Sequence, residues 1–158
     1  MSVSLVLIPL AVAYGATVGS AAIASLLAAV DNKSRTNAPQ VLEPVDTCFT
    51  DAALLQKTLA EHGLSVRALG EHDFVVETEA GTLHYFRPAP GAPFRLQAMH
   101  VADVDELLRS IDSLENEYGR NVQSFTYHHV LDELAAHGMT LDEEELLEDD
   151  TLVLRLNI

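Results

Sequence analysis

The sequence predicts an α+β fold in which an N-terminal apolar helix precedes a small acidic domain. Three observations support this prediction. Residues 2–30 contain no Asp, Glu, Lys, Arg or His, residues 31–44 are polar with two prolines, and residues 45–158 carry strand-like and helix-like hydrophobic patterns. We therefore divide the chain into an apolar helix at residues 1–30, a linker at residues 31–44 and an acidic α+β domain at residues 45–158.

The apolar run is long enough to cross a membrane. Its 29 residues exceed the roughly 20 that a helix needs to span a bilayer core. Lys33 and Arg35 follow the run, and basic residues beside a membrane helix favour the cytoplasmic side. The sequence therefore predicts a single-pass membrane protein with its C-terminal domain in the cytoplasm. The lone Cys48 agrees with such a reducing compartment.

Small residues recur every four positions within this run, at Ala11, Gly15 and Gly19. On a helix they would share one face, where a second helix can approach closely. Two other interpretations of the run stay open. One is a cleavable secretory signal with the small-residue motif Ala11-Val12-Ala13, although no Lys or Arg precedes the run. The other is a helix buried among other subunits of an assembly.

The domain opens with a short strand and a helix. Residues 45–49 alternate as in a strand, Thr50 or Asp51 suits the N-cap of the helix, and Gly63 suits its end. Further strand patterns follow at residues 64–69, 74–78, 82–86 and 94–98. The first three of these are separated by short turns and favour an antiparallel meander.

Helices and a hairpin complete the domain. Asp103 suits the N-cap of a helix that Gly119 is expected to break, and a further helix is expected at residues 122–136, before Gly138. Residues 139–147 and 151–158 then predict a hairpin around an acidic turn. We expect one antiparallel or mixed sheet with two or three helices on one face.

The chain is strongly acidic, with 24 Asp and Glu against 9 Lys and Arg and a net charge of −15. Negative charge repels nucleic-acid phosphates, so we expect no nucleic-acid partner. The expected partners are the membrane, through residues 2–30, and either a protein with a basic surface or further copies of the chain.

Motifs for catalysis or cofactor binding are missing from the sequence. It has no Gly-rich phosphate loop, no cysteine pair and no H-E-x-x-H. His128 and Asp132 are weak metal candidates at helical spacing, but a solvated helix face explains them more simply. His84 and His100 lie on or near predicted strands, and the acidic run at residues 142–145 lacks the glycine of an EF-hand loop. We expect no metal, no cofactor and no enzymatic activity.

Two stretches resemble a known family. The first is Asp46-Thr47-Cys48-Phe49-Thr50-Asp51 with the later Leu59-Ala60-Glu61-His62-Gly63. The second is Tyr118 and Tyr127, then Val130-Leu131-Asp132-Glu133, Gly138-Met139 and the acidic residues 143–145. Residues 45–158 are similar to a domain-of-unknown-function family of cyanobacteria, red-algal plastids and other bacteria. Met139 replaces the usual aromatic residue, and the apolar run is not part of the family pattern.

The resemblance implies a fold and no reaction, because the family has no established activity. It also implies an adaptor role, since some members accompany AAA-type ATPases. Two functions therefore fit the sequence. The first is a non-enzymatic, membrane-anchored interaction or adaptor module that presents an acidic cytoplasmic domain to a protein partner. The second is a structural subunit of a filament or shell, whose N-terminal apolar helices pack against each other.

Overall fold

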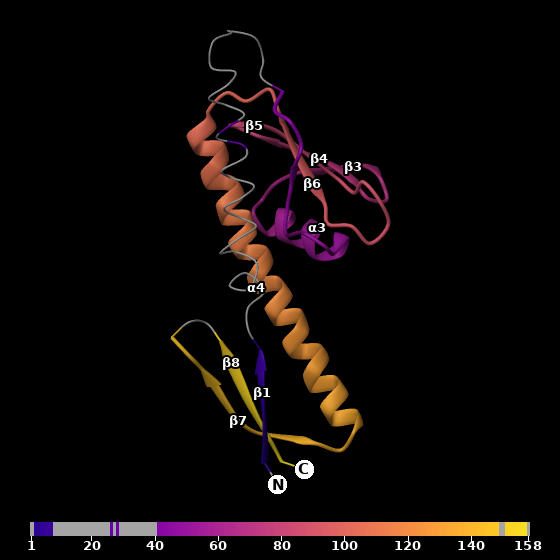
Figure 1. Cartoon of the computed structure of the whole chain (residues 1–158), viewed down its shortest axis with the longest axis vertical. Helices are drawn as coiled ribbons and strands as arrows, with labels where there is room; N and C mark the ends of the chain where they lie inside the picture. Colours follow the sequence, from indigo (N-terminus) through magenta and orange to yellow (C-terminus); the bar gives the residue numbers. More distant parts are fainter. Residues whose placement is uncertain (1, 8–25, 27, 29–40, 149–150, 158) are drawn as a thin grey trace.

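The computed structural model describes residues 2–7, 26, 28, 41–148 and 151–157. These residues form an α+β fold with two antiparallel sheets on one long helix, α4, which comprises Val104–Ala136 (Figure 1). At 1.5 Å per residue, this helix of 33 residues is about 50 Å long. The expectation of a single sheet is therefore wrong.

The larger sheet lies beside the N-terminal half of α4. Its strands are β2 (Val45–Asp46), β3 (Val66–Gly70), β4 (Asp73–Thr78), β5 (Gly81–Phe86) and β6 (Arg95–Met99), in the order β2-β6-β5-β4-β3. The predicted meander is confirmed as β3, β4 and β5. Gly81 begins β5 with a φ of 152°, and a Cβ there would lie 3.0 Å from the carbonyl oxygen of Met99. This close approach explains the glycine at the turn.

Helix α3, Ala52–Glu61, follows β2 where the sequence predicts a helix. Asp51 caps it, since its Oδ1 accepts a hydrogen bond from the N–H of Leu54 at 2.9 Å. Beyond its end, Gly63 has a φ of 72°, which is typical of a residue that ends a helix. The buried residues of α3 are Leu55, Thr58 and Leu59. Leu55 and Leu59 join α3 to the main hydrophobic core, which also contains Phe49, Phe74, Tyr85, Phe94, Ile111 and Leu114.

Helix α4 continues through the position where a break is expected. Asp103 caps it as predicted, with the N–H of Glu106 3.0 Å from Oδ1. Gly119 lies inside the helix and is buried, so the predicted division into two helices is wrong. A glycine in a helix interior costs only about 1 kcal/mol relative to alanine, and the packing of the neighbouring Tyr118 offsets that cost.

A buried polar network joins α3 to α4 near Gly119. The side-chain amide of Asn121 donates to Thr58 Oγ1 at 3.0 Å and to Glu61 Oε2 at 2.8 Å. Its Oδ1 accepts a hydrogen bond from Lys57 Nζ at 3.0 Å. Because Asn121 is only 7% exposed, these bonds satisfy an amide that burial would otherwise leave without water.

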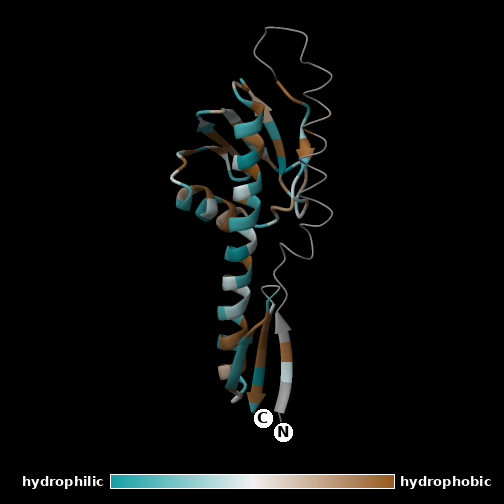
Figure 2. Cartoon of the chain, turned by 90° about the vertical axis from the view of Figure 1, so that its left-hand side faces the viewer, coloured by the Kyte–Doolittle hydropathy of each residue, from teal (hydrophilic) through white to brown (hydrophobic). Residues whose placement is uncertain are grey.

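The smaller sheet packs on the C-terminal half of α4, and both ends of the chain lie there (Figure 1). Its strands are β1 (Ser2–Leu7), β7 (Thr140–Leu146) and β8 (Leu152–Asn157), in the order β1-β8-β7. Leu152, Leu154 and Leu156 form its core with Leu5, Tyr127, Val130 and Leu134. Figure 2 shows the strand that leads to the C-terminus, with brown, hydrophobic segments, beside the lower half of α4. We call β1, β7, β8 and residues 122–136 of α4 the three-stranded unit.

The two sheets use opposite sides of α4. Tyr118 packs in the main core and Tyr127 in the smaller one. Nine residues at about 100° each make about two and a half turns, so the two side chains point to opposite sides of the helix axis. Figure 1 accordingly shows the two sheets on opposite flanks of the helix.

The membrane helix predicted at the N-terminus is wrong. Ser2–Leu7 forms the strand β1, which pairs with β8 so that Leu5 lies opposite Leu154. Across the described ranges, no helix is long and apolar enough to cross a membrane. Two predictions are therefore wrong, namely the fold class with an apolar transmembrane helix and the single-pass membrane location. The physical reason is that the residues of this short stretch also suit a strand, and β8 supplies its partner.

Candidate functional site

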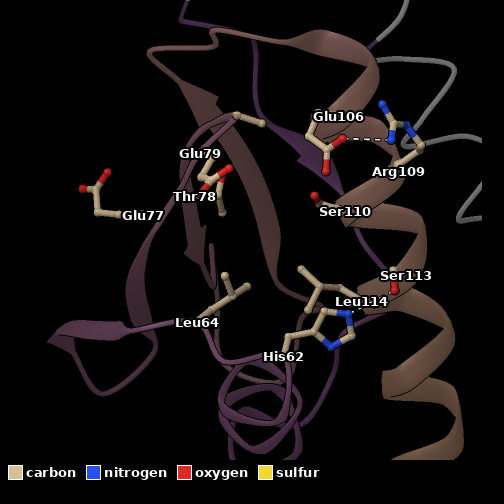
Figure 3. A pocket seen from close by; sticks show the side chains of 11 residues that line it. His62, Leu64, Glu77, Thr78, Glu79, Glu106, Arg109, Ser110, Ser113 and Leu114 are labelled. Carbon is tan, nitrogen blue, oxygen red and sulfur yellow. Dashed lines mark hydrogen bonds and ion pairs between the residues drawn. The ribbon is translucent and has the colours of Figure 1, made fainter.

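A cavity of about 650 Å³ opens between the larger sheet and α4 (Figure 3). Its walls come from the turn between β4 and β5, the end of α3 and about the first three turns of α4. The lining residues are His62, Leu64, Glu77, Thr78, Glu79, Ala80, Glu106, Arg109, Ser110, Ser113 and Leu114. The cavity therefore combines an apolar floor with carboxylate, hydroxyl, imidazole and guanidinium groups.

His62 and Ser113 form a hydrogen-bonded pair at one end of this cavity. His62 Nε2 lies 3.0 Å from Ser113 Oγ, and Figure 3 shows the two side chains facing each other from α3 and α4. A hydroxyl beside an imidazole is the first requirement for a nucleophile and its base. The second requirement is a group that orients the imidazole. Within the described residues, nothing forms a hydrogen bond with the other ring nitrogen of His62.

Other polar groups of the cavity already have partners. Glu106 and Arg109 form an ion pair at 2.9 Å. Thr78 Oγ1 donates to the carbonyl oxygen of Gly81 at 2.7 Å, and Glu77 accepts a hydrogen bond from Thr82 at 2.7 Å. These bonds stabilise the wall of the cavity. They give no support to a nucleophilic mechanism.

Three titratable side chains with raised pKa values, Cys48, Tyr85 and Glu115, interact between the larger sheet and α4. Burial, and then the charge of Glu115, raises the pKa of the Cys48 thiol to about 12. The same two causes, in the same order, raise the pKa of Tyr85, whose buried hydroxyl has no partner in the part of the chain that is described. Cys48 is thus a neutral thiol at physiological pH, and it lacks the thiolate that nucleophilic chemistry needs.

The pKa of the Glu115 carboxyl group lies near neutrality. Burial, and then the charge of Asp112, raises its pKa to about 7. Its Oε1 is buried and accepts no hydrogen bond from a described residue. This carboxyl group therefore makes the stability of the fold sensitive to pH between about 4.5 and 7.

The strand β7 presents a different kind of surface. All seven of its residues are exposed, and four in succession are acidic, from Asp142 to Glu145. Arg155 on β8 forms ion pairs with Glu143 and, at 3.8 Å, with Glu145. On the other side of the sheet, the hydroxyl of Tyr127 donates to Glu144 Oε2 at 2.9 Å, which raises the pKa of Tyr127. Among the described residues, the single positive charge of Arg155 therefore balances only one of the four negative charges of this strand.

The residues that the sequence singled out form no shared site in the described part of the chain. Ala11, Gly15 and Gly19 lie outside the described residues. His128 Nδ1 lies 2.7 Å from the carbonyl oxygen of Ser124, one turn earlier on α4. Asp132 is exposed on the same helix. In the described ranges, no group of three His, Cys, Asp or Glu side chains could hold a metal ion.

The two strand histidines are also in separate surroundings. His84 on β5 contacts Asp73 at 2.6 Å and lies opposite Gln97. His100 is exposed beyond the end of β6, with a φ of 51°. The pair that sequence reasoning missed is His62 and Ser113. These residues are 51 positions apart, so only the folded contact between α3 and α4 brings them together.

We compared the chain with protein families, curated proteins and solved structures. No family model, curated protein or solved structure matches the chain significantly. The resemblance of residues 45–158 to a family of cyanobacteria and red-algal plastids therefore stays a prediction.

Proposed function

We propose that the protein is an interaction module that binds a basic segment of a protein partner through β7. The proposal rests on one observation. β7 is a regular strand of a sheet, yet every residue on it is exposed and four of the seven are acidic. A fixed row of carboxylates accelerates the approach of a positively charged partner and disfavours other partners.

The position of β7 supports the same proposal. The three-stranded unit lies at the far end of α4 from the first turns of the helix, so a partner can reach it without contacting the larger sheet (Figure 1). Three large apolar side chains accompany the charges, since Leu141, Leu146 and Leu147 are 38%, 66% and 41% exposed. Such apolar groups beside charged ones supply the area that a binding surface must bury.

The experiment uses the full chain and a labelled ten-residue peptide of alternating lysine and valine. Fluorescence anisotropy at low salt measures the dissociation constant of the complex between the peptide and the full chain. Glu143→Gln with Glu145→Gln removes two charges from β7, and we expect the affinity to fall about tenfold, which equals about 1.4 kcal/mol. Raising the salt concentration should weaken binding as well, because exposed charges are screened.

The matched control removes two charges elsewhere, through Glu71→Gln with Glu79→Gln. Both side chains are exposed and belong to turns of the larger sheet. We expect this variant to bind the peptide with an affinity within about twofold of the parent chain, since screening limits exposed charges to local effects. Equal losses in the two variants would refute binding at β7 and leave only attraction by net charge.

A further inference from the structure

We infer that the basic partner binds as an added β-strand on the free edge of β7, with its basic side chains on one face and apolar side chains on the other. The inference rests on the proposed function, namely a basic partner at β7. It adds the geometry of binding and the sequence pattern of the partner. Strand addition obtains its affinity from main-chain hydrogen bonds and its specificity from alternate side chains.

β7 is an edge strand of the smaller sheet. The order β1-β8-β7 gives it one neighbour among the described residues, and its seven residues are exposed. An edge strand presents a row of unpaired N–H and C=O groups, which another extended chain can pair with. The position of β7 thus supplies backbone donors and acceptors in addition to charge.

One hydrogen bond shows which residues of β7 direct their backbone outward. The N–H of Leu147 donates to the carbonyl oxygen of Thr151 at 2.8 Å. In an antiparallel ladder, hydrogen-bonded pairs alternate with pairs that are not hydrogen-bonded to each other. Given the register of β7 with β8, Glu145 and Glu143 direct their backbone groups toward β8. Glu144 and Leu146 therefore direct theirs toward the free edge.

The side chains of β7 divide between the two faces of the sheet. Glu143 lies opposite Arg155, on the face away from α4. Leu141 and Leu146 lie opposite Leu156 and Leu152, on the face toward α4. Glu144 lies on this face too, but its carboxylate already accepts a hydrogen bond from Tyr127. An added strand with basic residues on the first face and apolar residues on the second would complement both. The partner segment is thus an extended stretch in which basic and apolar residues alternate.

A second copy of the chain fits this edge poorly. β7 contains no Lys or Arg, so pairing two β7 strands would place carboxylates against carboxylates. Like charges directly opposite each other across strands are destabilising. Natural proteins use charged edge strands to prevent pairing between copies. The same carboxylates that exclude a second copy select a basic strand.

The test measures amide hydrogen exchange by NMR in the full chain, with and without the lysine-valine peptide. At a peptide concentration ten times its dissociation constant, only about one-tenth of the protein is free. We therefore expect exchange of the Glu144 and Leu146 amides to slow about tenfold. The Glu143 and Glu145 amides already bond to β8, so their exchange should change little. They are the internal control.

Variants of Leu146 separate backbone pairing from side-chain contact. Leu146→Pro removes one outward N–H without changing charge or a bond to β8, and proline is tolerated at such edge positions. We expect it to weaken peptide binding about tenfold, whereas Leu146→Ala, which keeps the N–H, should weaken binding less than threefold. Circular dichroism checks that both variants fold.

The outcomes distinguish the two proposals. A peptide that binds with the expected charge dependence but leaves the Glu144 and Leu146 amides unchanged would overturn strand addition and keep the proposed function. No binding at low salt would overturn both. Slowing of these amides with rising protein concentration and no peptide would show that a second copy occupies the edge.

Discussion

Tyr118 joins α4 to the start of α3 through one hydroxyl group. Its oxygen accepts hydrogen bonds from the N–H groups of Thr50 at 3.0 Å and Asp51 at 2.9 Å. The side chain is 4% exposed. Tyr118→Phe leaves these two N–H groups without their partner, so we expect the free energy of unfolding to fall by about 1–3 kcal/mol. Urea denaturation of the full chain measures the change.

Tyr127→Phe is the matched control for that variant. The Tyr127 hydroxyl makes a single hydrogen bond, which it donates to Glu144 at an exposed site. Water can replace the lost partner there, so the expected cost is below about 1 kcal/mol. If both variants lost the same stability, burial of the Tyr118 hydrogen bond would not be the cause.

Glu115 makes stability depend on pH. Its pKa rises from 4.5 to about 7 in the folded chain because of burial and Asp112. The folded chain therefore holds the Glu115 proton more tightly than the unfolded chain does, so protonation of Glu115 stabilises the fold. Its contribution is fully present below pH 4.5 and is lost as the pH rises to about 7. Relative to Glu115→Gln, the free energy of unfolding of the parent chain should fall by about 1–2 kcal/mol between pH 4.5 and 8. This is less than the pKa shift alone would give, because Glu115 is partly exposed to solvent.

Denaturation at a series of pH values checks this prediction. The informative quantity is the difference between the parent chain and Glu115→Gln at each pH, because it removes the titration of all other groups. Glu79→Gln, at an exposed turn, provides the comparison. A difference that stays constant from pH 4.5 to 8 would contradict a raised pKa at Glu115.

Where the sequence predicts a helix or strand well, the capping and turn residues that determine its ends lie close together in the chain. Asp51 and Gly63 are within two residues of the ends of α3. The turn before Gly81 lies between two short strand patterns. Capping and turn formation depend on a few neighbouring residues, so the sequence is sufficient for them.

The errors in the prediction concern elements whose environment is distant in sequence. Ser2–Leu7 is a strand because β8, about 150 residues later, supplies its hydrogen bonds. Gly119 stays helical because the surrounding core holds it. An apolar run does not distinguish a strand from a buried helix by its pattern alone. Of the candidate site, the acidic residues of β7 could be predicted, but neither its free edge nor the pairing of His62 with Ser113 could.

At the scale of the whole molecule, the described residues form two hydrophobic cores that share only α4. No residue belongs to both clusters in the described part of the chain. The smaller core has three buried leucines, against 18 buried residues in the larger. Because apolar burial supplies most of the stabilising free energy, the three-stranded unit should open more often than the larger one.

Leu5→Asp tests this difference between the two units. Leu5 packs against the core of the three-stranded unit, where an unpaired charge is costly. We expect faster hydrogen exchange throughout residues 140–157, measured by mass spectrometry, with little change in β3 to β6. Ser4→Asp is the control, since Ser4 is exposed on the neighbouring position of the same strand, opposite Arg155. Faster exchange of both sheets in Leu5→Asp would instead show one cooperative unit, in which the partner-binding strand could not open without unfolding the larger sheet.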